Sequence, residues 1–168
     1  GLVGIISADV ALNIPDFRSP ERALQLIIQA AGRAGRGDEK GKVVIQTYSP
    51  EHYAVAFAAA QDYEGFYKTE IKLRKYMGYP PFSDMFQILF TSADQQEALR
   101  GAQSWHDRLM KALPEGEKGN LFRPQEAYMS KIKEKYRYSM LIKCPKGRRR
   151  GYSDMINSIR EEDKKDRK

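Results

Sequence analysis

The 168-residue sequence predicts an α/β unit followed by an α+β domain. The first 48 residues follow the order strand, helix, strand, which is typical of two parallel strands joined by a crossover helix. Residues 82–168 follow the order β-α-β-β-α, which is a split βαβ pattern without its last strand. The run Gly78-Tyr79-Pro80-Pro81 separates the two parts, because a residue that precedes proline disfavours the helical conformation.

Residues 1–48 are predicted to form one βαβ unit. Residues 1–8 are an apolar run typical of a buried strand, and residues 42–48 form a second strand rich in β-branched side chains. Between them, Ser19-Pro20-Glu21 supplies an N-cap, a proline at the first helical position and an acid in the first turn. The helix then carries an apolar stripe made of Leu24, Ile27, Ile28 and Ala31. Two strands do not make a stable sheet alone, so we expect this unit to be part of a larger domain.

Residues 49–81 are predicted to be a helical connector, with one long helix that ends near Tyr76. The α+β domain then covers residues 82–168 and resembles a ferredoxin-like unit whose final strand is missing or supplied elsewhere. Its expected elements are a strand over 82–91, a helix over 93–113, hairpin strands over 121–130 and 135–143, and a helix over 152–159.

The composition, with 41% hydrophobic and 30% charged residues, is that of a soluble globular protein. No run reaches the roughly 18 apolar residues of a membrane span, and the start lacks the basic leader of a signal peptide. The lone Cys144 cannot form an internal disulfide or a cysteine-rich zinc site, and it fits a reducing cytoplasm. His52 and His106 show no ligand or nucleophile pattern. We therefore predict no metal site and a cytoplasmic monomer that contacts no membrane.

Positive charge is concentrated in the last third of the chain. Residues 1–117 contain 13 Lys and Arg against 15 Asp and Glu, whereas residues 118–168 contain 16 against 7. Such a basic segment indicates a polyanionic partner. A solubilising tail is the alternative, and it fits residues 161–168, where both signs mix.

The octet Gln29-Ala30-Ala31-Gly32-Arg33-Ala34-Gly35-Arg36 sets two arginines three residues apart. Guanidinium groups are planar, stay charged and can stabilise the charge that builds on a γ-phosphate during phosphoryl transfer. Gly32 and Gly35 would let the backbone come close to a ligand and turn away from the helix. In the alternative interpretation the arginines only satisfy the last carbonyls of a helix, but that role requires neither the glutamine nor the doubled Gly-Arg.

The octet has the Q-x-x-G-R-x-G-R form of motif VI in superfamily 2 helicases. It is accompanied by Asp9-Val10-Ala11-Leu12-Asn13-Ile14-Pro15-Asp16-Phe17-Arg18, by Gln46-Thr47-Tyr48, by Gly78-Tyr79-Pro80-Pro81-Phe82 and by Tyr136-Arg137-Tyr138. With this spacing the chain resembles the C-terminal part of the primosomal replication-restart helicases over most of its length.

The resemblance implies the last part of a RecA-like helicase lobe 2 followed by a ribosomal-S10-like C-terminal domain. It also implies an ATP-dependent 3′-5′ DNA helicase that assembles the primosome at stalled forks in the bacterial cytoplasm, associated with the nucleoid. The implied cofactors of the full-length protein are ATP with Mg²⁺, and zinc bound upstream of this chain. The implied partners are DNA forks and single strands, the single-stranded DNA-binding protein and other primosome proteins.

Under this resemblance, Arg33 and Arg36 face the γ-phosphate, with Arg36 as the arginine finger, and Gln29 senses the phosphate. Gly32 and Asp9 are the candidate nucleotide-binding residues. Asp9 could contact the nucleotide sugar, hold an arginine in place, or act only as a structural cap or ion-pair partner.

The chain carries no phosphate-cradling loop of the G-x-x-x-x-G-K-[ST] form. The segment from Gly37 to Val43 is one residue short and has no hydroxyl for Mg²⁺ at its end. We therefore expect this chain alone to bind none of these cofactors and not to hydrolyse ATP.

Two basic clusters are the predicted DNA-binding surface. Four cations recur with period two along the hairpin and so share one face in an extended backbone: Lys131, Lys133, Lys135 and Arg137. Tyr136 and Tyr138 take the opposite face, where a core position is favoured over a base-stacking one. At the entry to the last helix lie Lys146, Arg148, Arg149 and Arg150, which oppose the helix dipole and so indicate an anionic partner. DNA is assigned to Lys146, Arg149 and Arg150, and the acidic tail of the single-stranded DNA-binding protein to Arg148.

A non-catalytic nucleic-acid-binding or ribosome-associated module is the rival interpretation. In that case the βαβ unit would be a scaffold, and no variant of the octet would have an ATP-linked effect.

Overall fold

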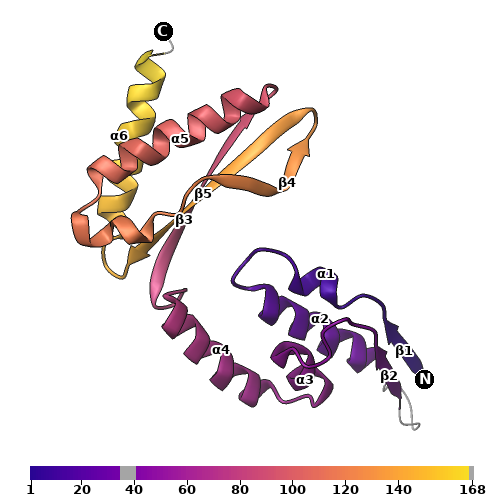
Figure 1. Cartoon of the computed structure of the whole chain (residues 1–168). Coiled ribbons are helices and arrows are strands. Elements are labelled where there is room, and N and C mark those ends of the chain that lie inside the picture. Colours follow the sequence, from indigo (N-terminus) through magenta and orange to yellow (C-terminus); the bar gives the residue numbers. More distant parts are fainter. Residues whose placement is uncertain (35–40, 167–168) are drawn as a thin grey trace. The chain divides into compact units, whose positions relative to one another are not determined.

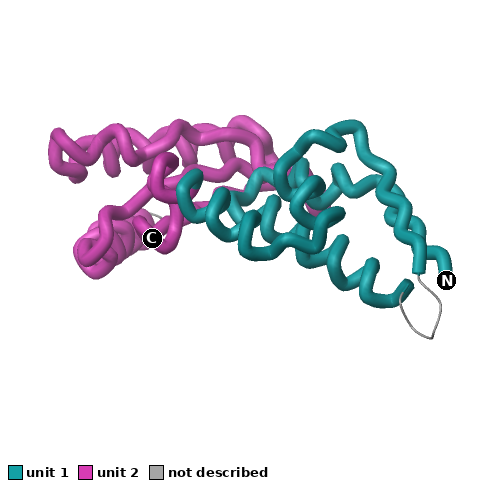
Figure 2. The backbone as a smooth tube through the Cα atoms, turned by 90° about the horizontal axis from the view of Figure 1, so that it is seen from below, with its two compact units in different colours: residues 1–73 teal, residues 74–168 magenta. Residues whose placement is uncertain are grey.

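The computed structural model describes residues 1–34 and 41–166. The chain divides into two compact units, residues 1–73 and residues 74–168 (Figure 2). The division lies inside helix α4 (Tyr63–Met77). No helix in the described part of the chain is long and apolar enough to cross a membrane.

Unit 1 is built on two parallel strands, β1 (Leu2–Ile5) and β2 (Lys42–Ile45). They pair in register from Leu2 with Lys42 to Ile5 with Ile45. The short helix α1 (Asp9–Leu12) and the long helix α2 (Ser19–Ala34) connect them. The predicted βαβ pairing is therefore present, although both strands are shorter than the sequence indicated.

The helical segment after β2 is not the single helix that the sequence predicted. It consists of α3 (Tyr53–Ala59) and α4, and the backbone reverses between them at Gln61, whose φ is 54°. The Asp62 carboxylate accepts a hydrogen bond from the Gly65 amide at 2.8 Å, and a Cβ at Gly65 would collide with Asp62 and with the Phe57 ring. This cap begins a second helix because it satisfies an amide that has no partner in the first turn.

Most of the segment predicted as a connector, residues 49–81, instead belongs to unit 1 and contributes to its core. Leu24 and Ile27 of α2 are 1% and 2% exposed and belong to one cluster with Ala54 and Ala58 of α3 and Phe66 of α4. The unit thus extends to residue 73, and the apolar side chains of α2, α3 and α4 are buried in one cluster.

Unit 2 is a mixed α/β domain with a three-stranded antiparallel sheet. Its elements are β3 (Ser83–Ser92), α5 (Gln95–Ala112), the 3-10 helix η1 (Glu115–Asn120), β4 (Gln125–Ile132), β5 (Lys135–Pro145) and α6 (Arg149–Asp166). The strand order is β3-β5-β4, so the last strand in sequence lies between the other two, as in a split βαβ arrangement. Helix α6 begins earlier and ends later than the predicted 152–159.

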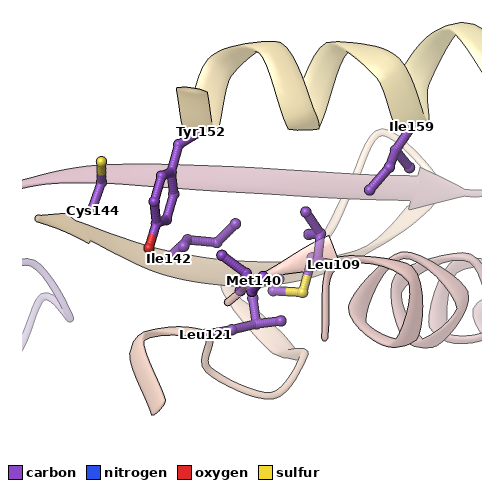
Figure 3. Packing of buried hydrophobic residues seen from close by; sticks show 8 residues of the cluster. Leu109, Leu121, Met140, Ile142, Cys144, Tyr152 and Ile159 are labelled. Atoms are coloured by element: carbon purple, nitrogen blue, oxygen red, sulfur yellow. The ribbon is translucent and has the colours of Figure 1, made fainter. Parts of the chain in front are cut away.

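Helices α5 and α6 cover one face of this sheet (Figure 1). Figure 3 shows Met140 and Ile142 of β5 beneath Tyr152 and Ile159 of α6, with Leu109 of α5 beside them. Alternate residues of a strand point to opposite faces. The even-numbered residues of β5 therefore fill this core, and its odd-numbered residues belong to the other face.

Candidate functional site

The described part of the octet lies on α2 rather than on a turn. Gln29, Gly32 and Arg33 occupy positions i, i+3 and i+4 and so form one stripe of the last helical turns. All three are exposed, and nothing lies within 4 Å of a Cβ placed on Gly32. Gly32 therefore continues the helix instead of turning the chain away, and it leaves open space beside Arg33. Arg36 and Gly35 lie outside the described residues.

Arg33 is exposed near the end of α2. Within residues 1–34 and 41–166 it forms no ion pair, and its side chain is exposed in the last turn of α2. The alternative role as a partner of the last carbonyls has no support here, because the structure shows no hydrogen bond from Arg33 to a described carbonyl.

Asp9 lies at the opposite end of the βαβ unit from Arg33. A Cβ on Gly1 would lie 3.2 Å from the Ala34 carbonyl oxygen, so the end of α2 adjoins the amino end of β1. Asp9 follows the carboxyl end of β1, and a strand of four residues spans about 13 Å. Asp9 therefore does not hold Arg33 in place. The sequence grouped these residues as one nucleotide site, but they lie at opposite ends of the strands.

The Asp9 carboxylate is used to join the two strand ends. The Thr47 hydroxyl donates to Oδ1 at 2.8 Å, and the Tyr48 amide donates to Oδ2 at 3.1 Å. Burial tends to raise the pKa of Asp9, but these hydrogen bonds outweigh it and the pKa is lowered. Asp9 thus has a structural role, but it joins the segments that follow β1 and β2 by neutral hydrogen bonds and is neither the helix cap nor, among the described residues, the ion-pair partner that the sequence suggested. The contact with a nucleotide sugar stays a prediction.

Sequence reasoning missed a second carboxylate, Asp16. Arg18 donates to both of its oxygens, with Nε 3.1 Å from Oδ1 and Nη2 2.9 Å from Oδ2, and Arg22 Nη1 lies 3.1 Å from Oδ2. The hydrogen bond from Arg18 holds the pKa of Asp16 below its usual value. Arg18 lies two residues after the acid and Arg22 six, and this spacing is the signal that could have found the cluster.

The four hairpin cations do not share one face, contrary to the prediction. Lys133 and Glu134 form a two-residue turn with φ of 48° and 60°, so the extended backbone is interrupted between β4 and β5. Lys131 pairs with Tyr136, and Ile132 pairs with Lys135. Cross-strand partners lie on the same face of a sheet. Lys131 therefore takes the face of Tyr136, while Lys135 and Arg137 take the opposite one.

Two of these cations have partners within the chain. Lys131 Nζ lies 2.7 Å from Glu134 Oε2 and 5.0 Å from the centre of the Tyr136 ring. Arg137 Nη1 donates to the Met129 carbonyl at 3.2 Å. Lys133 and Lys135 are exposed, and neither forms an ion pair with any residue that the structure describes.

The second basic cluster surrounds the start of α6. Lys146, Arg149 and Arg150 are exposed and form no ion pair inside the described ranges. Arg148 differs from them, because it pairs with Glu117, which also accepts a hydrogen bond from the Tyr152 hydroxyl at 2.6 Å. Burial, together with Glu117, raises the pKa of Tyr152 to about 12.

Tyr138 is a core residue, as favoured by the sequence: its side chain is 7% exposed and packs with Ala98 and Ala102 of α5. Among residues 1–34 and 41–166, no group of three or more His, Cys, Asp or Glu side chains could hold a metal ion.

Comparison with known proteins places unit 2 in a defined class. Residues 75–168 match the family described as "Primosomal protein N C-terminal domain". The "Replication restart protein PriA" of Bacillus subtilis is 38% identical over 144 residues, which are 84% of this chain and 17% of that protein.

Two further relatives carry the same name. That of Borreliella burgdorferi is 37% identical over 139 residues, 83% of this chain and 21% of the relative. That of Treponema pallidum is 37% identical over 144 residues, 86% of this chain and 22% of the relative. The chain belongs to the PriA family, and unit 2 is the C-terminal domain of that family. The whole chain spans about a fifth of the length of the curated relatives that it matches.

Proposed function

We propose that this chain is the C-terminal part of an ATP-dependent 3′-5′ DNA helicase that restarts replication by assembling the primosome at stalled forks. Membership of the PriA family carries this proposal, because the relatives are named replication restart proteins. The exposed stripe of Gln29, Gly32 and Arg33 supports it, since this is the part of the octet that a nucleotide would meet.

Unit 1 is proposed to be the last part of a RecA-like lobe 2. Its two strands and the residue that follows β1 expose large apolar side chains that a single folded unit would bury: Leu2 is 71% exposed, Val44 49% and Ile6 81%. Contiguous apolar exposure of this kind marks a surface that another part of a protein covers. The remaining strands of a helicase lobe are a cover of the right kind, because parallel sheets are buried on both faces.

Arg33 and Arg36 are proposed to stabilise the charge of the γ-phosphate, with Arg36 as the finger and Gln29 as the phosphate sensor. When bound, ATP with Mg²⁺ supplies the phosphate bond whose cleavage drives movement along DNA. Arg33, exposed and without an ion pair among the described residues, has the charge and accessibility that a triphosphate requires. The residues that cradle the nucleotide belong to other parts of the full-length protein, as does any zinc site, because this chain has one cysteine.

DNA is the proposed ligand of those cations of the two basic clusters that form no ion pair with a described residue: Lys133, Lys135, Lys146, Arg149 and Arg150. Such cations bind phosphates without reading sequence, so affinity should fall steeply with salt. Arg148 is proposed to bind the acidic tail of the single-stranded DNA-binding protein. Its contact with Glu117 means that the tail would have to compete with that carboxylate. Other primosome proteins are further proposed partners, and the proposed setting is the nucleoid in the cytoplasm.

The test of the motor role uses a full-length PriA that carries this chain as its C-terminal part. Arg36→Ala and Arg33→Ala are compared with Arg100→Ala, an exposed arginine of α5. Loss of the finger should lower DNA-stimulated ATP hydrolysis by about 10³–10⁵-fold and leave DNA affinity within twofold. Unchanged hydrolysis in both octet variants would favour the rival function, a nucleic-acid-binding module whose βαβ unit is a scaffold.

A further inference from the structure

One of the two edge strands of the unit 2 sheet, β4, is bulged. Strand β4 pairs with β5 at Glu126 with Tyr138 and again at Lys131 with Tyr136. Residues 127–130 of β4 therefore lie opposite Arg137 alone. Figure 1 shows β4 at the outer side of β5, consistent with the strand order β3-β5-β4. A bulge at a sheet edge changes the directions in which its side chains point. The side chains of residues 127–130 are therefore a candidate binding surface.

Arg137 fastens the bulge to the sheet. Its guanidinium Nη1 donates to the Met129 carbonyl oxygen at 3.2 Å. A hydrogen bond from a charged donor is worth more than a neutral one and fixes the direction of the carbonyl that accepts it. Arg137 is half-buried on β5, and its cation is committed to the backbone of its own hairpin. The sequence spacing assigned Arg137 to phosphate binding, but in the structure its guanidinium group instead holds the bulge in position.

The fastened bulge presents Tyr128, which is 60% exposed, beside Met129, which is 57% exposed. Next along the hairpin come Lys133 and Lys135, exposed and without ion pairs among the described residues. An exposed aromatic side chain and exposed cations in one hairpin are the combination that binds single-stranded nucleic acid, since bases stack on the ring while the cations follow the phosphates.

We infer that the β4 bulge is a base-stacking site for single-stranded nucleic acid, in which Tyr128 stacks on an unpaired base and Arg137 is a positioning residue. This inference rests on the proposed DNA binding by unit 2 and specifies which form of DNA the hairpin binds. A paired base is already stacked within the duplex, so the ring at an exposed edge reaches only an unpaired one. Lys133 and Lys135, exposed in the same hairpin and without ion pairs among the described residues, favour a polyanion over an apolar protein partner.

The test measures binding of the whole chain to a fluorescent 20-nucleotide oligothymidine and to a 20-base-pair duplex over a range of salt concentrations. Stacking contributes about 1–3 kcal/mol per base. Tyr128→Ala should therefore weaken single-strand binding about 5- to 150-fold without changing the salt slope, and should leave duplex binding within twofold. Tyr128→Phe should retain affinity. Tyr63→Ala is the matched control, because Tyr63 is 57% exposed on α4 of unit 1.

Two further variants separate positioning from phosphate contact. Lys133→Ala should reduce the salt slope, as loss of one phosphate contact does. Arg137→Gln should instead lower single-strand affinity with an unchanged slope, and should add little to Tyr128→Ala, because both act through the bulge. Circular dichroism and the melting temperature check that each variant is folded.

The outcomes distinguish the inference from the proposed function. If the wild-type chain binds neither the oligothymidine nor the duplex, both the proposed DNA binding and the stacking site are contradicted. A wild-type chain that binds DNA while Tyr128→Ala binds single strands equally well, or loses single strands and duplex alike, removes only the stacking site. A reduced salt slope in Arg137→Gln would mean that Arg137 contacts phosphate and is not a positioning residue.

Discussion

Single side chains of this protein are held by partners far away in sequence, and these partners decide what each side chain can do. Asp9 accepts hydrogen bonds from Thr47 and Tyr48, which follow it by 38 and 39 residues. Arg148 likewise pairs with Glu117 across 31 residues. In both cases a charged group that could have bound a ligand instead forms hydrogen bonds with other residues of the fold.

The lowered pKa of Asp9 predicts a dependence of stability on pH. A carboxylate whose pKa is lower in the folded state stabilises the fold above its unfolded pKa of about 3.9, and that contribution is lost as the pH falls through the folded pKa. Asp9→Asn should therefore flatten the acid side of the melting-temperature profile between pH 7 and pH 3. The control is Asp154→Asn, an exposed acid on α6. Parallel profiles for wild type and Asp9→Asn would contradict this assignment.

At the scale of elements, the β4–β5 hairpin determines which basic side chains are presented together. Its two-residue turn carries Lys133 and Glu134 in the left-handed region, where a β-carbon is unfavourable. The turn also reverses the expected alternation, so that Lys131 joins the face of Tyr136. The basic surface is therefore smaller than a continuous stripe, and it is centred on the turn.

The turn geometry predicts that Glu134→Gly stabilises unit 2. Glycine adopts a positive φ without steric cost, and the gain should be about 1 kcal/mol. Some of this is offset by the lost pair with Lys131, which is exposed and contributes little. Urea unfolding should show a higher midpoint for Glu134→Gly. In contrast, Glu126→Gly, within β4, should lower the midpoint, since strand glycines are destabilising. A lower midpoint for Glu134→Gly would show that the turn is not strained.

The whole molecule consists of two units, each with a core of its own. Leu24 and Ile27 belong to the core of unit 1, whereas Leu109, Met140 and Ile142 belong to that of unit 2. The boundary falls within a continuous helix, α4, so the units are joined without an intervening loop. Separate cores are the physical basis for expecting separate unfolding.

Core truncations should therefore act on one unit at a time. Leu24 is 1% exposed and Leu109 is 0% exposed, and a buried Leu→Ala change costs about 2–5 kcal/mol. Trp105, the single tryptophan, packs against the unit 2 core and reports its unfolding by fluorescence. Leu109→Ala should shift the fluorescence transition in urea to lower concentration, while Leu24→Ala should leave it in place and shift the far-UV circular dichroism. An equal shift of the fluorescence transition by both variants would mean that the units unfold as one.

Much of the element order could be read from local pattern. The period of apolar residues predicted α2 and α5, and alternation predicted β3 and the buried face of β5, with Tyr138 in the core. These features depend on neighbours a few residues apart, which the sequence displays directly. The break between α3 and α4 could not be read in this way, because it depends on Asp62 capping a new helix and on Phe57 packing against Gly65.

The sequence by itself determined the two-part organisation, the octet with its arginines, the basic last third and the resemblance to a helicase family, because composition and motif spacing are properties of the linear chain. Only the tertiary structure decided that Asp9 and Arg33 lie at opposite ends of the strands, that Lys131 and Arg137 have internal partners, and that Tyr128 projects from a bulge. These facts depend on strand register and on contacts between distant residues. A shift of one residue in register exchanges the faces of a strand, and the local pattern placed the turn only somewhere within residues 131–134, not at Lys133 and Glu134.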